Sequence, residues 1–182
     1  MKDTYKRPDR VKELLEITTA SQITYGTACV QAGADIIFLS DPTSSGDAVS
    51  IKTWEEFGLP YTTRVVDAIK KTGVKVIMHI CGDTSDRLES LARTGVHCLS
   101  LDSKVDLGHA RKTLGQMCLL GNIDPSHTLI FKKPQEVEEV TREAIGKAGA
   151  RGAFILSSGC GVSALTPPEN IRAMAKVART PG

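Results

Sequence analysis

The chain has 182 residues, of which 41% are hydrophobic, and its formal net charge at pH 7 is only +2. This length and composition allow one domain with a sizeable core. Acidic and basic residues are mixed along the sequence without a basic stripe, so we expect no nucleic acid partner. No apolar run is long enough for a membrane span, and the polar first ten residues do not resemble a secretory signal. We therefore expect a cytoplasmic protein without a membrane partner.

A helix, a glycine, a short apolar strand and a polar strand end recur five times along the chain. The first helix is expected from about Arg10 to Gln31, with Gly33 at the position after the helix that needs a left-handed backbone. Its strand follows at 35–39, and the later strands are expected at 74–80, 96–101, 117–120 and 153–156. Helices that alternate with fully apolar strands are typical of a buried parallel sheet.

Two of the later helices have recognisable starts. A short helix is expected at 86–93, with Thr84 or Ser85 as its N-cap. The last helix follows Thr166-Pro167-Pro168-Glu169, which has the spacing of a capping box with proline at the first helical position.

The five cysteines differ in their surroundings. An odd number of cysteines without an export signal indicates no disulfide framework. Cys29 lies in a helical pattern, whereas Cys98 and Cys118 each begin an apolar run, so these three are most simply core residues. Cys81 and Cys160 lie at or just after a strand end beside glycine. These two are candidates for chemistry.

In parallel α/β folds the active site gathers at the carboxyl ends of the strands. A single aspartate there is commonly a helix cap or part of a turn, and we favour that role for Asp102 taken alone. The presence of several unusual polar residues at one edge is what indicates a functional site. These residues are Asp41, His79, Cys81, Asp102, Asn122, Asp124 and Cys160.

The stretch 74–82 reads as a buried strand that ends in a His-x-Cys pair. Because strand side chains alternate with a period of two, His79 and Cys81 should project to the same side. Imidazole and thiolate suit zinc, but two ligands do not hold it in a tetrahedral site. The pair alone favours the simpler interpretation of a hydrogen-bonded histidine and a small buried cysteine. A zinc site requires a third ligand from elsewhere in the chain.

Five units do not close an eight-stranded barrel, which typically takes about 250 residues. Either the sheet is open, or the five units are the C-terminal part of a barrel that lacks its first strands. A truncated barrel would expose two strand edges, and self-association could cover them.

Four groups of residues at these strand ends resemble the uroporphyrinogen decarboxylase superfamily. They are Asp41-Pro42-Thr43, His79-Ile80-Cys81-Gly82-Asp83, Gly121-Asn122-Ile123-Asp124-Pro125, and Gly159-Cys160-Gly161 through Thr166-Pro167-Pro168-Glu169-Asn170. Within the superfamily, the chain is most similar to the C-terminal part of the methylcobalamin:coenzyme M methyltransferases of methanogenic archaea. The resemblance implies an α/β fold of the TIM (β/α)8 barrel type, here incomplete with about five βα units. Residues 1–182 would form the C-terminal portion of this single barrel domain.

The resemblance also implies a set of site residues. The methyltransferases carry the His-x-Cys pair and the later cysteine as zinc ligands, which assigns zinc to His79, Cys81 and Cys160. Decarboxylases resemble Gly-His-Gly where this chain has Gly159-Cys160-Gly161. Residues expected to orient the ligands or to contact substrate are Asp41, Asp102, Asn122, Asp124 and Ser158.

By this resemblance, the expected function is zinc-dependent transfer of a methyl group from a methylated corrinoid, such as methylcobalamin on a corrinoid protein, to a thiol such as coenzyme M. Zinc with three protein ligands keeps a position at which a substrate thiol loses its proton. Two alternatives stay open. One is uroporphyrinogen decarboxylation in porphyrin and heme biosynthesis, and the other is a non-catalytic barrel fragment.

Overall fold

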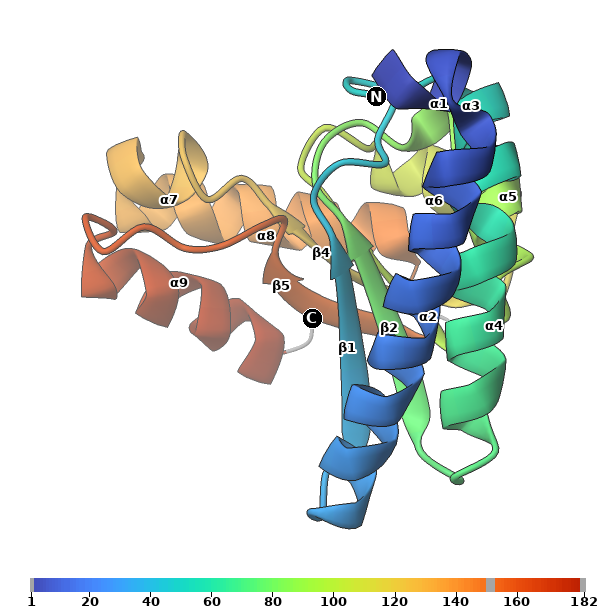
Figure 1. Ribbon diagram of the computed structural model, residues 1–182. Coiled ribbons are helices and arrows are strands. Elements are labelled where there is room, and N and C mark those ends of the chain that lie inside the picture. The colour runs from blue at the N-terminus through green and yellow to red at the C-terminus, as the bar shows by residue number, and fades with distance from the viewer. Residues whose placement is uncertain (1, 150–152, 181–182) are drawn as a thin grey trace.

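A computed structural model describes residues 2–149 and 153–180. Five parallel strands form one curved sheet in chain order, with β1 and β5 at its edges (Figure 1). The strands are β1 (Ile36–Asp41), β2 (Lys75–Ile80), β3 (Cys98–Leu101), β4 (Cys118–Ile123) and β5 (Phe154–Ser158). The predicted parallel α/β sheet is confirmed, and its five strands do not close into a barrel within the described ranges.

Helices follow each strand and pack along the sheet. In chain order they are α1 (Lys2–Lys6), α2 (Pro8–Gln31), α3 (Ile51–Phe57), α4 (Leu59–Lys70), the 3-10 turn η1 (Ser85–Arg87), α5 (Leu88–Ala92), α6 (Leu107–Leu114), α7 (Thr128–Phe131), α8 (Pro134–Ala148) and α9 (Pro168–Arg179). Helix α2 packs on β1 and α4, α4 packs on β2, and α8 packs on β4, β5 and α9 (Figure 1). Over the described ranges, none of these helices combines the length and the apolar character that crossing a membrane would require.

The two faces of the sheet have different surroundings because strand side chains alternate. One set packs against the helices and forms the main core, which includes Ile37, Val76, Met78, Leu99 and Leu119. The opposite set faces the concave side, where Ile36, Phe38 and Ile155 remain 52%, 52% and 47% exposed. Since fully apolar strands are typical of sheets covered on both faces, this half-open arrangement agrees with part of a barrel.

Several predicted boundaries are confirmed by the backbone. Helix α2 ends at Gln31, and Gly33 has a φ of +102°, as its position after the helix requires. Gly58 separates α3 from α4, so the helical stretch between β1 and β2 consists of two pieces.

Two predicted helix starts are confirmed in position but not in their side-chain caps. Thr84 lies at the N-cap position of η1, as predicted, but its side chain makes no capping hydrogen bond, and the Ser85 N–H donates to the Asp83 carboxylate. Helix α9 begins at Pro168, so proline is at the first helical position as predicted, but the N-cap residue is Pro167, which provides no capping hydrogen bond. The Thr166 hydroxyl is buried, and no hydrogen-bond partner for it lies in the described part of the chain. The three-residue spacing therefore occurs here without the capping box.

Candidate metal centre

Three side chains from two distant parts of the chain converge at the carboxyl edge of the sheet. His79 lies in β2, Cys81 follows β2 directly, and Cys160 follows β5. Their ligand atoms all lie within 4.8 Å of one another. The Cys81 Sγ is 3.3 Å from the His79 Nε2 and 3.6 Å from the Cys160 Sγ.

Two of the three ligand separations are close to those expected around a tetrahedral zinc ion. Zinc–sulfur bonds of about 2.3 Å and zinc–nitrogen bonds of about 2.0 Å place two sulfurs about 3.8 Å apart, and a sulfur and a nitrogen about 3.5 Å apart. The two short contacts of Cys81 lie within a few tenths of an ångström of these values. The donor set of one imidazole and two thiols is also one that zinc prefers.

The hydrogen bonds of His79 leave its Nε2 free to act as a ligand. The ring is 6% exposed, and its Nδ1 lies 3.1 Å from both the carbonyl oxygen and the hydroxyl of Ser100 on β3. A carbonyl oxygen can only accept, so Nδ1 carries the proton and the Nε2 lone pair faces Cys81. Metal-binding histidines are commonly oriented in this way through the other ring nitrogen.

Replacing Ser100 by alanine should weaken zinc binding by about tenfold, at the lower end of the range for outer partners of metal ligands, because the carbonyl contact persists. Titration with a zinc chelator of known affinity measures the change. The control is Ser40→Ala, because Ser40 pairs with His79 from β1 and lines the same pocket but has no described contact with the Nδ1. Equal zinc affinity in both variants and the parent would contradict a role of the Ser100 hydroxyl in orienting His79.

The backbone after Cys81 is held from two sides. The Gly82 N–H donates to the Asp102 carboxylate at 2.9 Å. Gly82 has a φ of +93°, and a methyl group there would lie 2.5 Å from Asp47 Oδ2. Asp47 in turn accepts from the Asp83 N–H and pairs with the Lys104 ammonium at 2.8 Å. The loop after β1 and the turn after β3 therefore fix the position of Cys81.

The environment of Cys81 disfavours a free thiolate. Burial and the neighbouring Cys160 thiol raise the pKa of Cys81 to about 11. The nearby carboxylates of Asp102 and Asp41 act in the same direction. A bound cation would have the opposite effect on the pKa of Cys81, because a metal ion favours the deprotonated form of a coordinating thiol.

Cys160 is held by the tight turn after β5. A methyl group at Gly159 would approach the Ser103 amide nitrogen to 2.5 Å, so this turn lies directly against the turn after β3. The Ser158 hydroxyl donates to the carbonyl oxygen of Cys160 at 2.8 Å. Ser158, a predicted site residue, thus braces the backbone of Cys160.

The three candidate ligands line an open pocket of about 400 Å³ on the concave side of the sheet. The Phe38 ring stacks near His79, with 6.2 Å between the ring centroids. Other lining residues are Ser40, Ser100, Leu120, Ser157, Ser158 and Gly161. This mixture of an apolar ring, hydroxyls and sulfur ligands leaves space for a small molecule beside the cluster.

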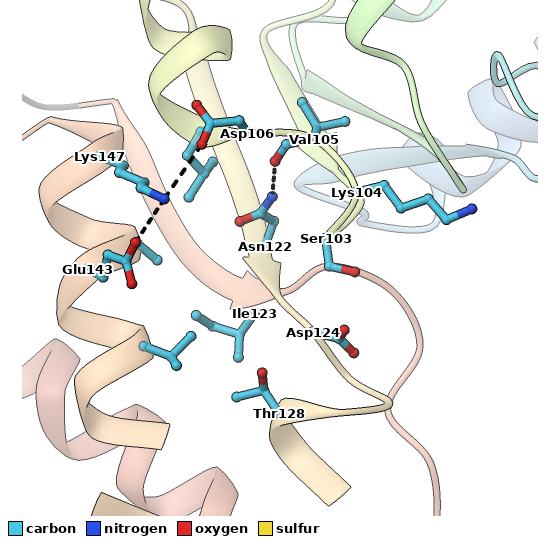
Figure 2. A pocket seen from close by; sticks show the side chains of 13 residues that line it. Ser103, Lys104, Val105, Asp106, Asn122, Ile123, Asp124, Thr128, Glu143 and Lys147 are labelled. Atoms are coloured by element: carbon cyan, nitrogen blue, oxygen red, sulfur yellow. Dashed lines mark hydrogen bonds and ion pairs between the residues drawn. The ribbon is translucent and has the colours of Figure 1, made fainter. Parts of the chain in front are cut away.

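Two of the predicted site residues lie in a different pocket, between β4, α6 and α8 (Figure 2). The Asn122 side-chain amide donates to the carbonyl oxygens of Asp102 and Val105 at 3.0 and 2.7 Å. Asp124 accepts from the backbone N–H groups of Ser126 and His127. Although burial opposes its ionisation, these hydrogen bonds hold the pKa of Asp124 below its usual value. Both side chains thus shape turns at this edge.

Asp41 also engages its own turn, since its carboxylate accepts from the N–H and the hydroxyl of Thr43. It faces a pocket beside α2 and α4 that does not include the cysteines. Of the five residues expected around the ligands, Asp102 and Ser158 support the segments that carry Cys81 and Cys160.

Reasoning from the sequence missed Ser100 and Asp47. Ser100 is a polar residue in an otherwise apolar strand, two residues after Cys98, and that pattern was a usable signal. Asp47 lies in the loop after β1, and its sequence context carries no comparable signal.

The fold places this protein in the class of barrel-type α/β proteins with a parallel sheet. Its distinguishing feature is a His/Cys/Cys cluster at the carboxyl edge of that sheet. The model of the uroporphyrinogen decarboxylase (URO-D) family matches residues 1–181, and the chain belongs to this family.

Relatives within the family have two different names. The chain is 34% identical to the methylcobamide:CoM methyltransferase MtbA of Methanosarcina mazei, over 94% of this chain and 49% of the relative. It is 31% identical to a uroporphyrinogen decarboxylase of Geotalea daltonii, over 91% of this chain and 48% of the relative. A solved methyltransferase from Methanosarcina mazei superposes with a TM-score of 0.89 and 28% identity, over 98% of this chain and 52% of that structure. The chain therefore spans about half the length of the curated relatives that it matches.

Proposed function

We propose that this chain carries the zinc site of a methyltransferase that moves a methyl group from a methylated corrinoid to a thiol such as coenzyme M. The convergence of the His79, Cys81 and Cys160 ligand atoms within 4.8 Å supports this proposal most directly. The similarity to relatives named methylcobamide:CoM methyltransferases supports the same donor and acceptor classes. A corrinoid protein is the proposed partner that would present the methyl group.

A zinc ion held by three protein ligands supplies a fourth position at which a thiol binds and loses its proton near neutral pH. The chain itself contributes the geometry. His79 presents its Nε2 because Ser100 holds the other ring nitrogen. The Asp102 carboxylate and the turn at Gly159 fix the backbone beside the two cysteines.

The open pocket is the proposed binding place for the thiol. Its Ser157 hydroxyl and the backbone after β5 offer polar groups for the anionic end of a small thiol. Phe38 and Leu120 provide apolar contacts for the carbon atoms between the two ends of such a molecule. We propose that the thiol lies along this pocket with its sulfur toward the three ligands.

Uroporphyrinogen decarboxylation is the second candidate, because curated relatives at similar identity have that name. A cluster of two thiols and an imidazole has no evident use in that reaction. An incubation with methylcobalamin and coenzyme M, set beside an incubation with uroporphyrinogen, separates the two activities. Loss of carbon dioxide from the porphyrinogen without demethylation of the corrinoid would overturn the proposal.

Thiol binding provides a test that does not depend on turnover. The zinc-loaded chain should release about one proton per site when coenzyme M is added, and X-ray absorption should detect one additional sulfur neighbour of zinc. The His79→Ala variant should show neither change. A zinc-loaded parent chain whose zinc coordination stays the same with excess thiol would contradict the proposal.

A further inference from the structure

A second pair of cysteines lies on the concave face, apart from the candidate zinc ligands. Cys98 on β3 and Cys118 on β4 are direct partners in the register of the sheet. Each lies two residues before a residue that lines the zinc pocket, Ser100 and Leu120 respectively. Because side chains alternate along a strand, both thiols face the same side as that pocket, one layer farther from the carboxyl edge.

The two thiols are neighbours across β3 and β4 in an apolar layer. Burial and the interaction with the Cys118 thiol raise the pKa of Cys98 well above its usual value. Cys98 is 3% exposed and Cys118 is partly exposed, so the concave side gives access to the pair through Cys118. The register places Ile77 beside Cys98 and Phe38 beside Ile77 in the same layer.

The burial of the pair favours an ion over a disulfide. Thiol–disulfide exchange requires an accessible thiolate, and a cysteine buried in apolar surroundings, such as Cys98, is inert in this exchange. A bound cation instead stabilises both thiolates directly.

The number and the type of ligands select the ion. Zinc takes four ligands, and the described residues contain no third histidine, cysteine or carboxylate close enough to complete a cluster with Cys98 and Cys118. Thiolates are soft ligands that suit Cu(I), zinc and iron–sulfur clusters, and of these ions Cu(I) is the one that two thiolates satisfy. An apolar layer suits a soft ion of low charge better than a hard divalent ion.

We propose that Cys98 and Cys118 form a second metal site that binds one Cu(I) ion through two thiolates. Binding releases one proton from each thiol and changes no oxidation state, so the site becomes a bis-thiolate complex with a net charge of minus one. It does not depend on the proposed methyl transfer, because none of its ligands belongs to the zinc cluster.

The test uses a background in which the zinc cluster cannot bind copper. The Cys81→Ser/Cys160→Ser variant, titrated with Cu(I) without oxygen against the chelator bicinchoninate, should bind one Cu(I) per chain. X-ray absorption at the copper edge should detect two sulfur neighbours. Adding Cys118→Ala should weaken binding by at least 100-fold, and adding Cys29→Ala instead should leave it unchanged.

Two results would overturn the copper site. One is a background variant that leaves all the copper with the chelator, and the other is retention of tight binding when Cys118→Ala is present. Because Cys118 is less buried than Cys98, truncating Cys118 should disturb the fold less than truncating Cys98. Thermal unfolding of each variant verifies that lost binding is not lost structure. Zinc retained by a Cys98→Ala/Cys118→Ala variant would separate this site from the candidate zinc centre.

Discussion

The His79→Ala and Cys160→Ser variants should each lose most of the zinc that the purified chain holds, from about one ion per chain to a tenth or less. A structural zinc site uses four ligands and a catalytic one uses three, so removing one of three leaves a pair that does not hold the ion. Removing a residue that only hydrogen-bonds to a metal ligand typically lowers metal affinity by about 10–100-fold, and removing a ligand itself should lower it further. Metal analysis after dialysis against a weak chelator measures the loss.

The matched control for Cys160→Ser is Cys29→Ser, which removes a partly exposed thiol on α2, far along the chain from the cluster. This variant should keep its zinc. Circular dichroism should show the same secondary structure in all three variants, because the cluster lies at the edge of the sheet and outside the helix-facing core. Unchanged zinc in both His79→Ala and Cys160→Ser would show that the ligand assignment is wrong.

The Gly159→Ala variant should be less stable by about 1–3 kcal/mol, the usual cost of forcing extra atoms into a packed site. The added methyl group would approach the Ser103 nitrogen to 2.5 Å and the Ser103 Cα to 3.1 Å, and neither backbone atom can rotate away. The turn after β5 must then shift, and Cys160 shifts with it. Zinc affinity should fall by about tenfold or more as the ligand geometry is lost.

Gly161→Ala is the control for this change, because it alters the residue on the other side of Cys160 in the same chemical way. No described atom lies within 4 Å of the methyl group that it would add. Its free energy of unfolding and its zinc affinity should stay close to those of the parent chain. Urea unfolding followed by circular dichroism, together with chelator titration, measures both quantities. Similar losses in the two variants would contradict the role assigned to the close contact at Ser103.

Local sequence patterns were sufficient to predict most of the fold. The alternation of helices, glycines and apolar runs located all five strands and the order of the helices, because each depends on side chains close together in sequence. The side chains of Thr84 and Thr166 do not cap their helices, although Thr84 lies at the predicted N-cap position, because a matching spacing does not decide which nearby oxygen reaches a free N–H group. Beside Thr84, the Asp83 carboxylate accepts the hydrogen bond of the Ser85 N–H.

The sequence by itself determined the pairing of His79 with Cys81 on one side of β2, since a period of two requires it. Only the tertiary structure decided that Cys160 lies 3.6 Å from Cys81, because 79 positions of chain separate them and the curvature of the sheet brings β2 and the end of β5 together. The tertiary structure also decided that Ser100 orients His79. The two residues are far apart in sequence, and the register of β2 and β3 brings them side by side. The proposed zinc site depends on how the strand ends meet in the fold, and short motifs specify only its parts.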